Sequence, residues 1–324
     1  MTDWSGHDGT ETARRYRLMG ELQLRGISPS YERLCLGVAD DDELIARLDT
    51  LPREKRQPNL LLASVRFCDG PVSSYGQFRS FVLDEWDRVA ATMSQRRTQT
   101  NEPARCATLL PALAALPQPL ALLEIGASAG LCLYPDRYAY RYDDRPQLGT
   151  SSVVFDCAVT GPAPLPAALP SVAWRAGLDL NPLDVRSAAD RRWLEALVWP
   201  EQRARFDTLR AALDLAATDP PHLVAGDLTQ DTVQLAEQAP AAATLVVFHS
   251  AVLAYLDDAG RTAFGEQLRA IAATRPVVWL ANEAPGVVVD VDPPAGPVPF
   301  VLSRDGAPLA FTGPHGQYLD WMSA

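Results

Sequence analysis

The chain has 324 residues, of which 47% are hydrophobic, so it is long enough to bury one large core or one core with an attached unit. Its formal net charge of −11 argues against binding to nucleic acid or to an anionic membrane surface, because both need clustered lysine and arginine. We therefore expect a small-molecule substrate. The first twenty residues contain no apolar segment of the kind found in signal peptides or membrane spans, which predicts a cytoplasmic protein.

The cysteines and histidines do not indicate a metal site. The five cysteines are scattered singly without a CxxC pair, and no two of the four histidines have the spacing of metal ligands. We expect buried, reduced thiols and a reaction that uses no metal ion.

The first third of the chain is predicted to be helical. Apolar residues recur there at intervals of three and four in six stretches, Tyr16–Leu24, Ser30–Leu36, Asp41–Leu51, Leu60–Phe67, Phe78–Met93 and Glu102–Leu116. Pro117 and Pro119 interrupt this pattern. These observations predict a helical N-terminal domain or lid over residues 1–117.

Short apolar runs alternate with helical stretches after residue 117. The predicted strands are Leu120–Ile125, Trp174–Leu180, His222–Ala225, Thr244–His249, Pro276–Asn282, Phe300–Arg304 and Leu309–Thr312. Asp305-Gly306 is a strong hairpin signal between the last two. The fold class predicted for residues 118–324 is α/β, a Rossmann-like doubly wound sheet with a C-terminal antiparallel hairpin.

An insertion of about residues 138–171 interrupts this alternation. It contains two strand-like pieces, Tyr138–Tyr142 and Val153–Val159, and then the proline- and alanine-rich stretch Gly161–Pro170, which is typical of an extended linker. We expect the insertion to decorate the core.

The sharpest motif is LLEIGASAGL. Glu124 lies late in the first predicted strand, and Gly126 and Gly130 frame a turn into a helix expected to begin near Ser128. Glycine allows positive φ and close approach of a ligand, and a helix N-terminus offers free amide donors. The turn lacks the central glycine of the dinucleotide fingerprint, which disfavours nicotinamide and flavin cofactors. Two glycines are also compatible with an ordinary tight turn, but a carboxylate in an apolar strand favours a cationic ligand.

Two further acids follow the next two strands. Asp179 ends the second strand and is suited to a ribose diol, although a turn or helix-capping role is an alternative. Asp227 ends the third strand and is suited to the amine of adenine. Three acids at successive strand ends form a more specific pattern than any one of them.

This pattern resembles the class I S-adenosylmethionine-dependent methyltransferases from about Leu120 to the C-terminus. The resemblance implies an enzyme with S-adenosylmethionine as its cofactor. Glu124, Gly126, Ser128 and Gly130 would line the methionine and sulfonium region. Asp179 with Leu180 would bind the ribose, and Asp227 with Leu228 the adenine.

Nearly the whole chain also resembles a bacterial family known as a domain of unknown function. The segments that carry this resemblance are RQPNLLLASVRF, RRTQTNE, LEIGASAGLCLYPDRY, GLDLNPLDV, LEALVWPEQ and VVFHSAVLAYL. This resemblance implies a fold but no activity.

Catalytic candidates follow the fourth and fifth strands. His249 is placed as a general base that titrates near neutral pH, and a buried histidine with backbone partners is the alternative. Ser250 and Tyr255 are expected beside the same pocket. Asn282 and Glu283 end the fifth strand, where the first would bind an acceptor and the second would remove its proton.

The polar run Arg96–Glu102 has two interpretations. It is either a solvated loop that caps the next helix or a cover over the cofactor site, in which Arg97 and Asn101 bind a carboxylate. Tyr134 is a further acceptor candidate, although tyrosines that alternate at Tyr138, Tyr140 and Tyr142 are more typical of one face of a strand.

The leading hypothesis is a transferase that methylates a small molecule. Transfer of the aminocarboxypropyl group or cyclisation of the same cofactor is an alternative, as is a binding protein without catalysis. A serine hydrolase is a further alternative, because Gly126-Ala127-Ser128-Ala129-Gly130 has the spacing of a nucleophile elbow.

Overall fold

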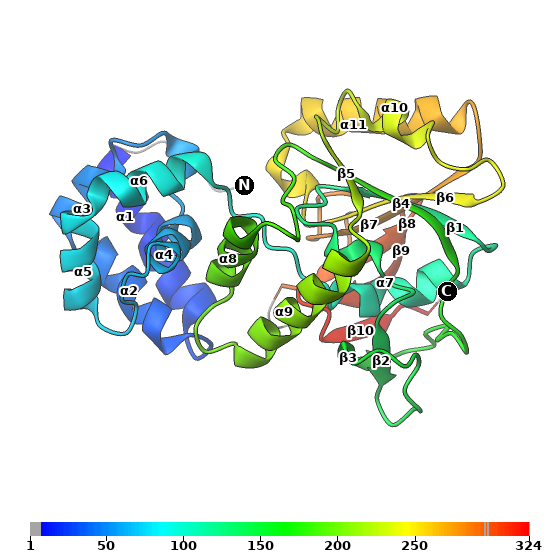
Figure 1. The fold of residues 1–324 in the computed structure, drawn as a ribbon, viewed down its shortest axis with the longest axis horizontal. Helices are drawn as coiled ribbons and strands as arrows, with labels where there is room; N and C mark the ends of the chain where they lie inside the picture. Colours follow the sequence, from blue (N-terminus) through cyan, green and yellow to red (C-terminus); the bar gives the residue numbers. More distant parts are fainter. Residues whose placement is uncertain (1–7, 295, 297, 324) are drawn as a thin grey trace. The chain divides into compact units, whose positions relative to one another are not determined.

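The computed structural model describes residues 8–294, 296 and 298–323. Within them the chain is a mixed α/β protein with eleven α-helices and a ten-stranded sheet (Figure 1). No helix in the described part of the chain combines the length and apolar character needed to cross a membrane.

The α-helices are α1 (Asp8–Leu18), α2 (Pro29–Ala39), α3 (Asp42–Leu48), α4 (Pro58–Phe67), α5 (Tyr75–Asp84), α6 (Trp86–Gln95), α7 (Arg105–Ala114), α8 (Ala188–Leu197), α9 (Arg203–Thr218), α10 (Thr232–Ala236) and α11 (Asp258–Ala272). The strands are β1 (Leu120–Ile125), β2 (Ala139–Tyr142), β3 (Val154–Thr160), β4 (Val172–Asp179), β5 (His222–Ala225), β6 (Thr244–Ser250), β7 (Val277–Glu283), β8 (Phe300–Arg304), β9 (Ala307–Thr312) and β10 (Tyr318–Trp321).

The chain divides into two compact units. The helical unit comprises the described residues up to Thr100 together with residues 186–210, and the sheet unit comprises residues 101–185 and 211–323. This division differs from the expected boundary at residue 117, because α7 belongs to the sheet unit and α8 to the helical unit. Contacts between helices distant in sequence, such as α4 with α8, account for the division.

The helical unit confirms the helical pattern of the N-terminal sequence. Most of its apolar positions are buried, with Leu22 and Ile27 as exposed exceptions, and the single stretch expected over Phe78–Met93 is split at Glu85 into α5 and α6. Trp193 of α8 is fully buried, and its indole nitrogen donates to the Arg97 carbonyl at 3.0 Å. The segment 186–210 therefore completes a core that the first hundred residues do not complete alone.

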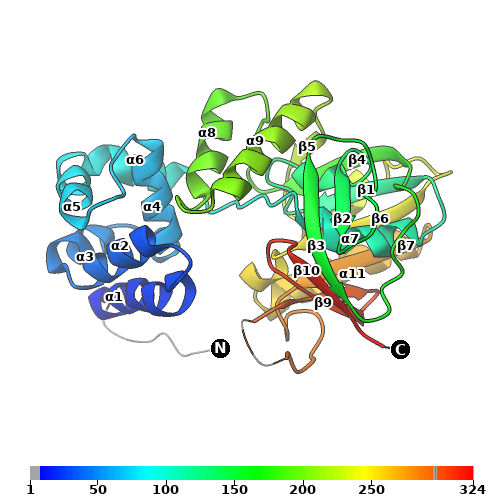
Figure 2. The same cartoon turned by 90° about the horizontal axis from the view of Figure 1, so that it is seen from below.

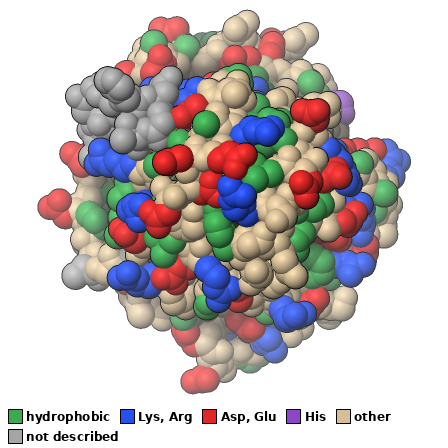
Figure 3. Space-filling view, turned by 90° about the vertical axis from the view of Figure 1, so that its left-hand side faces the viewer, with side chains coloured by type: hydrophobic (Ala, Val, Ile, Leu, Met, Phe, Trp, Pro, Cys, Tyr) green, Lys and Arg blue, Asp and Glu red, His purple; other side chains and the backbone are tan. Residues whose placement is uncertain are grey.

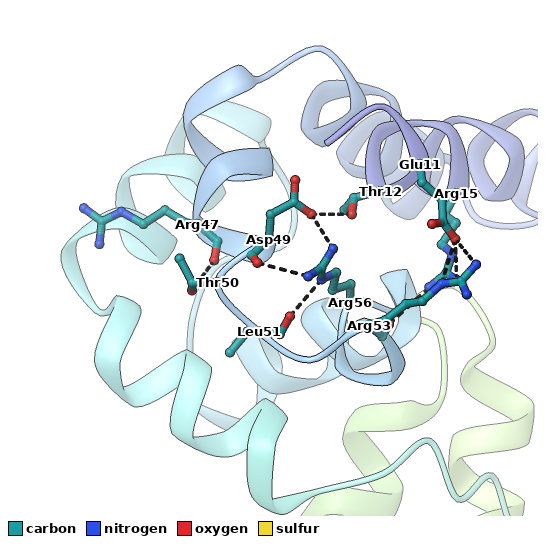
Figure 4. A network of polar contacts seen from close by, with 9 residues as sticks. All are labelled: Glu11, Thr12, Arg15, Arg47, Asp49, Thr50, Leu51, Arg53 and Arg56. Atoms are coloured by element: carbon teal, nitrogen blue, oxygen red, sulfur yellow. Dashed lines mark hydrogen bonds and ion pairs between the residues drawn. The ribbon is translucent and has the colours of Figure 1, made fainter. Parts of the chain in front are cut away.

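A partly buried ion pair organises the end of α3 (Figure 4). The Asp49 carboxylate accepts from Thr12 Oγ1 at 2.6 Å and from Arg56 Nη1 at 3.0 Å, while Arg56 Nε donates to the Leu51 carbonyl at 2.8 Å. Beside it, Arg53 lowers the pKa of the Glu11 carboxyl group through a hydrogen bond. These contacts fix the loop between α3 and α4 to α1.

The outer surface of the helical unit carries charges of both signs. Figure 3 shows acidic and basic side chains interspersed on this face without a block of either sign. Several pair with each other, for example Arg17 with Asp40 at 2.6 Å and Arg79 with Glu43 at 2.6 Å. Exposed pairs of this kind contribute roughly 0.2–1 kcal/mol each, so the unit depends mainly on its apolar core.

The sheet has the order β2-β3-β10-β9-β8-β7-β6-β1-β4-β5. The five strands from β7 to β5 are parallel, and β8, β9 and β10 continue the sheet in antiparallel pairs (Figure 2). β4 and β5 extend the sheet on one side of β1, and β6 and β7 extend it on the other side. The predicted strands are confirmed within two residues at each end.

Two features of the sheet differ from the sequence expectation. The insertion is not a decoration, because β2 and β3 extend the same sheet and β3 pairs in parallel with β10. β10 was not predicted. Its four residues are too few to give a clear alternation, and they pair with β3 from a segment about 160 residues away in the chain, which no local pattern encodes.

The two faces of the parallel strands are buried differently. Ala121, Leu123 and Ile125 of β1 pack with α10 and α11, which Figure 1 shows along one face, here called the α11 face. Because side chains alternate along a strand, Leu120, Leu122 and Glu124 point to the opposite face, here called the α7 face. Both faces are therefore closed, as the continuous apolar run of β1 requires.

We predict different costs for two glycine substitutions in the C-terminal hairpins. Gly316 (φ +77°) and Gly306 (φ +81°) both have left-handed backbones, but a Cβ at Gly316 would lie 2.1 Å from the Ala104 carbonyl oxygen, whereas nothing lies within 4 Å at Gly306. Gly306→Ala should lower the free energy of unfolding by about 1–2 kcal/mol. Gly316→Ala should lower it by about 1–3 kcal/mol more, measured by urea denaturation. Equal costs would contradict this packing of the hairpin on α7.

Candidate functional site

The carboxyl ends of the parallel strands meet at one edge of the sheet. Ile125 of β1 is level with Leu178 of β4 on one side and with His249 of β6 on the other. β7 continues this register, since His249 is level with Ala281. The residues that follow each strand therefore share this edge, and the alternation of side chains decides on which face each one lies.

The glycine turn after β1 has three alternate left-handed residues. The φ angles are +67° at Gly126, +53° at Ser128 and +72° at Gly130, so Ser128 adopts the backbone conformation that usually favours glycine. A Cβ at Gly126 would lie 2.4 Å from Val252 Cγ2, which explains why no larger residue fits there. The position that the sequence analysis treated as a missing glycine thus has a glycine-like conformation.

Side chains hold this turn in place. Ser128 N donates to Asp179 Oδ2 at 2.8 Å, and Leu131 N donates to Asn101 Oδ1 at 2.9 Å. The helix expected near Ser128 is wrong. Only the 3₁₀ turn Leu131–Leu133 follows, because the chain then leaves for β2.

Glu124 is buried on the α7 face at the end of β1. Its side chain is 5% exposed, and Oε2 has no hydrogen-bond partner among the described residues. Burial, together with the neighbouring Cys132 thiol, raises the pKa of Glu124 well above its ordinary value, although Arg105 opposes this shift. The carboxyl group therefore lacks a counter-charge within hydrogen-bonding distance.

The acids that follow β4 and β5 stabilise local backbone. Asp179 Oδ1 accepts from Asn181 N at 2.8 Å, in addition to the bond from Ser128, so this side chain joins the ends of β4 and β1. Asp227 Oδ1 accepts from Thr229 N at 2.8 Å in a turn after β5. Asp179 therefore stabilises a turn, as one of the two interpretations of the sequence predicts. Its carboxylate also lies beside Ser128.

A polar cluster on the α7 face surrounds Ser250. Asn282 is fully buried, its Nδ2 donates to Ser250 Oγ at 3.0 Å, and its Oδ1 accepts from Thr312 Oγ1 at 2.7 Å. Arg105 Nη1 donates to the Ser250 carbonyl at 3.0 Å. Ser250 and Asn282 therefore share a face with Glu124. Both polar atoms of the Asn282 amide are already hydrogen-bonded to protein side chains.

His249 and Glu283 lie on the α11 face. Nδ1 of His249 is 2.7 Å from Glu283 Oε1, and the indole nitrogen of Trp279 donates to His249 Nε2 at 2.9 Å. The imidazole ring is completely buried and contacts the Phe264 ring edge-on. Both ring nitrogens are engaged and the ring faces away from Glu124, so the structure leaves no free ring nitrogen for the general base that the sequence predicts here. The buried alternative describes His249, with side-chain partners instead of backbone ones.

Glu283 is a structural acceptor in the same cluster. Its Oε1 also accepts from Val252 N at 2.7 Å and from Leu253 N at 3.1 Å. Burial raises its pKa, but the hydrogen bonds from His249 and from these two amides outweigh burial and lower it overall. The group is therefore held as a carboxylate that fixes the chain after β6, which leaves it poorly suited to remove a proton.

The remaining predicted residues divide between surface and core. Tyr255 is 72% exposed and Leu180 is 62% exposed, whereas Leu228 packs against the core of the α11 face. Tyr134 is fully buried and its hydroxyl donates to the Asp219 carbonyl at 2.6 Å, so it is a core residue and not an acceptor contact. Arg97 belongs to the helical unit, where its side chain is exposed.

Arg105 was missed by the sequence analysis. It is only 8% exposed at the start of α7, its Nε donates to the Pro314 carbonyl at 2.9 Å, and its guanidinium lies 5.5 Å from the centre of the Phe300 ring. One feature of the sequence could have indicated this residue, because Arg105 is an arginine at the start of an otherwise apolar helical stretch that extends to Leu113. Its partners are more than 140 residues away in the chain and could not be predicted.

The hydrolase alternative loses its base. Ser128 has the positive φ expected of a nucleophile elbow, but His249 has both nitrogens engaged on the opposite face. In the part of the chain that the structure describes, no three His, Cys, Asp or Glu side chains converge in a way that would hold a metal ion.

We predict that stability depends on pH through Glu124. The folded chain retains a proton that the unfolded chain releases above about pH 4.5, so the free energy of unfolding should fall as pH rises, by at most about 1.4 kcal/mol per pH unit. Glu124→Gln should reduce this slope above about pH 4.5, measured by urea denaturation. Glu266→Gln, at an exposed position on α11, is the control and should leave the slope unchanged. An unchanged slope in the Glu124 variant would refute the claim that burial raises the pKa of Glu124.

We also predict that His249 is a neutral imidazole with its proton on Nδ1. Trp279 donates to Nε2, which must then carry a lone pair, while Nδ1–H donates to Glu283. The ¹⁵N chemical shifts of the ring should identify this tautomer. Trp279→Phe should cost about 1–3 kcal/mol because it leaves buried Nε2 without a donor. A proton observed on Nε2 in the wild type would contradict the assignment.

Comparison with known proteins places the chain in a family. The sequence pattern of the family described as "Uncharacterized protein conserved in bacteria (DUF2332)" matches residues 13–321. A search of curated proteins finds no match. Because the match covers nearly the whole chain, including both units and every site residue discussed above, this protein belongs to the bacterial family DUF2332.

Proposed function

We propose that the sheet unit binds S-adenosylmethionine at the carboxyl ends of β1 and β4 and that the protein transfers its methyl group to a small molecule. The observation that carries the proposal is the pairing of Glu124 and Asp179. Both side chains lie on the α7 face, at the carboxyl ends of the neighbouring parallel strands β1 and β4. The left-handed turn 126–130 directly follows β1. This is the arrangement of acids that the resemblance to class I methyltransferases implies.

The topology of the parallel strands supports a ligand at this edge. In order along the chain, the five strands β1, β4, β5, β6 and β7 lie in the spatial order 3-2-1-4-5, as in doubly wound sheets. In such sheets ligands bind outside the carboxyl ends where the direction of strand addition reverses. The reversal occurs here between β1 and β6, next to Glu124. The replacement of the first crossover helix by β2 and β3 is the main departure from this arrangement.

The residues present fit the cofactor. Glu124 has a buried oxygen without a partner, and a cationic ligand would supply the missing counter-charge. A carboxylate accepts up to about four hydrogen bonds, so Asp179 can bind a ribose hydroxyl while it holds Ser128 N. Gly126 and Gly130 allow the left-handed backbone that forms the turn at this edge.

The expected chemistry requires positioning more than proton removal. S-adenosylmethionine supplies an electrophilic methyl group on a sulfonium centre. The turn 126–130 and Asp179 would fix the donor, and Glu124 would balance its charge. Because His249 and Glu283 are engaged on the other face, we assign neither of them as base. Tyr255, exposed after β6, is the residue that we expect to contact the acceptor.

Binding of S-adenosylmethionine is the first test. In calorimetric titration the wild type should bind, and Asp179→Ala should weaken binding by about tenfold or more because it removes the ribose acceptor and loosens Ser128. Asp156→Ala is the matched control, since this aspartate is 70% exposed on β3 and should not affect binding. Absence of binding by the wild type, or equal affinity of the two variants, would reject the proposal.

The products formed with a metabolite extract separate the remaining alternatives. Mass spectrometry should detect a methylated metabolite together with S-adenosylhomocysteine. Methylthioadenosine in its place would indicate transfer of the aminocarboxypropyl group or cyclisation, and binding without turnover would indicate a non-catalytic binding protein.

A further inference from the structure

A buried arginine and a buried glutamate approach the same strand ends without forming an ion pair. Arg105 binds the carbonyl of Ser250 at the end of β6, and Glu124 lies at the end of the adjacent β1. No contact within 4.0 Å joins their charged groups among the described residues, although each is less than one-tenth exposed. Burying either group in its charged form is costly unless it has a partner, and burial accordingly raises the pKa of Glu124 in the free protein.

Both groups have hydrogen-bonding capacity to spare. The bonds that Arg105 makes to described residues use Nε and Nη1, which leaves the two N–H groups of Nη2. Glu124 has Oε2 without a partner. The guanidinium is fixed by two backbone carbonyls and by the Phe300 ring, so it offers Nη2 in a constrained position.

The turn between the two groups is anchored to the same segment. Cys132 Sγ donates to the Glu102 carbonyl at 3.3 Å, and Asn101 accepts from Leu131 N. Residues 101–105 are thereby held beside residues 131 and 132, near the carboxyl end of β1 where Glu124 lies. Electrostatic attraction between the two groups agrees with this proximity, since Arg105 lowers the pKa of Glu124 against the larger effect of burial.

We infer that Arg105 and Glu124 form a subsite for the two charges of an α-amino-acid group, with Arg105 binding the carboxylate and Glu124 the ammonium. A dipolar group between them would supply both missing partners without adding net charge. The inference rests on the proposed function, in which the amino-acid end belongs to the methionine part of the cofactor. It assigns to Arg105 the carboxylate binding that the sequence analysis assigned to Arg97.

The test compares S-adenosylmethionine with two compounds that lack some of its charged groups. Decarboxylated S-adenosylmethionine lacks only the carboxylate, whereas 5′-methylthioadenosine lacks the carboxylate, the ammonium and the sulfonium charge. The wild type should bind S-adenosylmethionine about 10- to 100-fold more tightly than the decarboxylated compound, as expected for a charge-assisted pair of hydrogen bonds. Arg105→Gln should abolish this ratio, and Arg105→Lys should retain part of it.

Glu124→Gln gives a complementary pattern. It should weaken S-adenosylmethionine, its decarboxylated form and S-adenosylhomocysteine, which has the ammonium but no sulfonium charge, to a similar degree and leave 5′-methylthioadenosine unchanged. Arg304→Gln, on β8 with an exposed side chain, is the control and should preserve every ratio. Circular dichroism and thermal unfolding identify variants that fail to fold, and the wild-type ratio tests the inference even if both Arg105 variants unfold.

The outcomes distinguish the inference from the proposed function. If wild-type protein binds S-adenosylmethionine and its decarboxylated form equally, the subsite is refuted while the proposed function stands. If Arg105→Gln folds and retains the wild-type ratio, the role of Arg105 is refuted. If none of the three compounds binds, both the proposed function and the subsite are refuted.

Discussion

The parallel pairing of β1 with β4 and β6 is the constraint on which the rest of the site depends. Backbone hydrogen bonds on both sides fix the register, so Glu124 is level with Gly177 and Phe248, and Ile125 is level with Leu178 and His249. With the register fixed, a shift of one residue along any strand would exchange its two faces. The chemical character of each face therefore follows from a few residues at the strand ends.

The two faces contain polar groups of different kinds. On the α11 face, His249, Glu283 and Trp279 bind one another and tie the chain after β6 to β7, although Glu283 Oε2 has no partner among the described residues. On the α7 face, Glu124 Oε2 also has no partner, and Arg105 has N–H groups beyond those it donates to carbonyls. Three hydrogen bonds to Oε1 lower the pKa of Glu283, whereas burial raises the pKa of Glu124, which has no comparable set of donors. This contrast is why we place the ligand on the α7 face.

The route of the chain after β1 explains the departures from a simple doubly wound sheet. In place of a crossover helix, the chain makes a 3₁₀ turn and then supplies β2 and β3 to the far end of the sheet. The turn 126–130 thus lacks the amide array of a helix N-terminus. Within it, Ser128 N is bound by Asp179 and the amides of Gly126, Ala127 and Gly130 by backbone carbonyls, so the charged side chains Glu124 and Arg105 provide the polar groups of the proposed site.

The sequence by itself determined the parallel strands, the helices of the first hundred residues and the hairpin at Asp305-Gly306, because apolar periodicity and turn residues act locally. It also singled out Glu124 and Asp179 as candidate binding residues, because an acid at the end of an apolar strand is unusual. Only the tertiary structure decided that His249 faces away from Glu124, that Trp279 and Glu283 occupy its nitrogens, and that Arg105 reaches Ser250. Those facts depend on register and on contacts between segments 30 to 145 residues apart, for which one sequence contains no local signal.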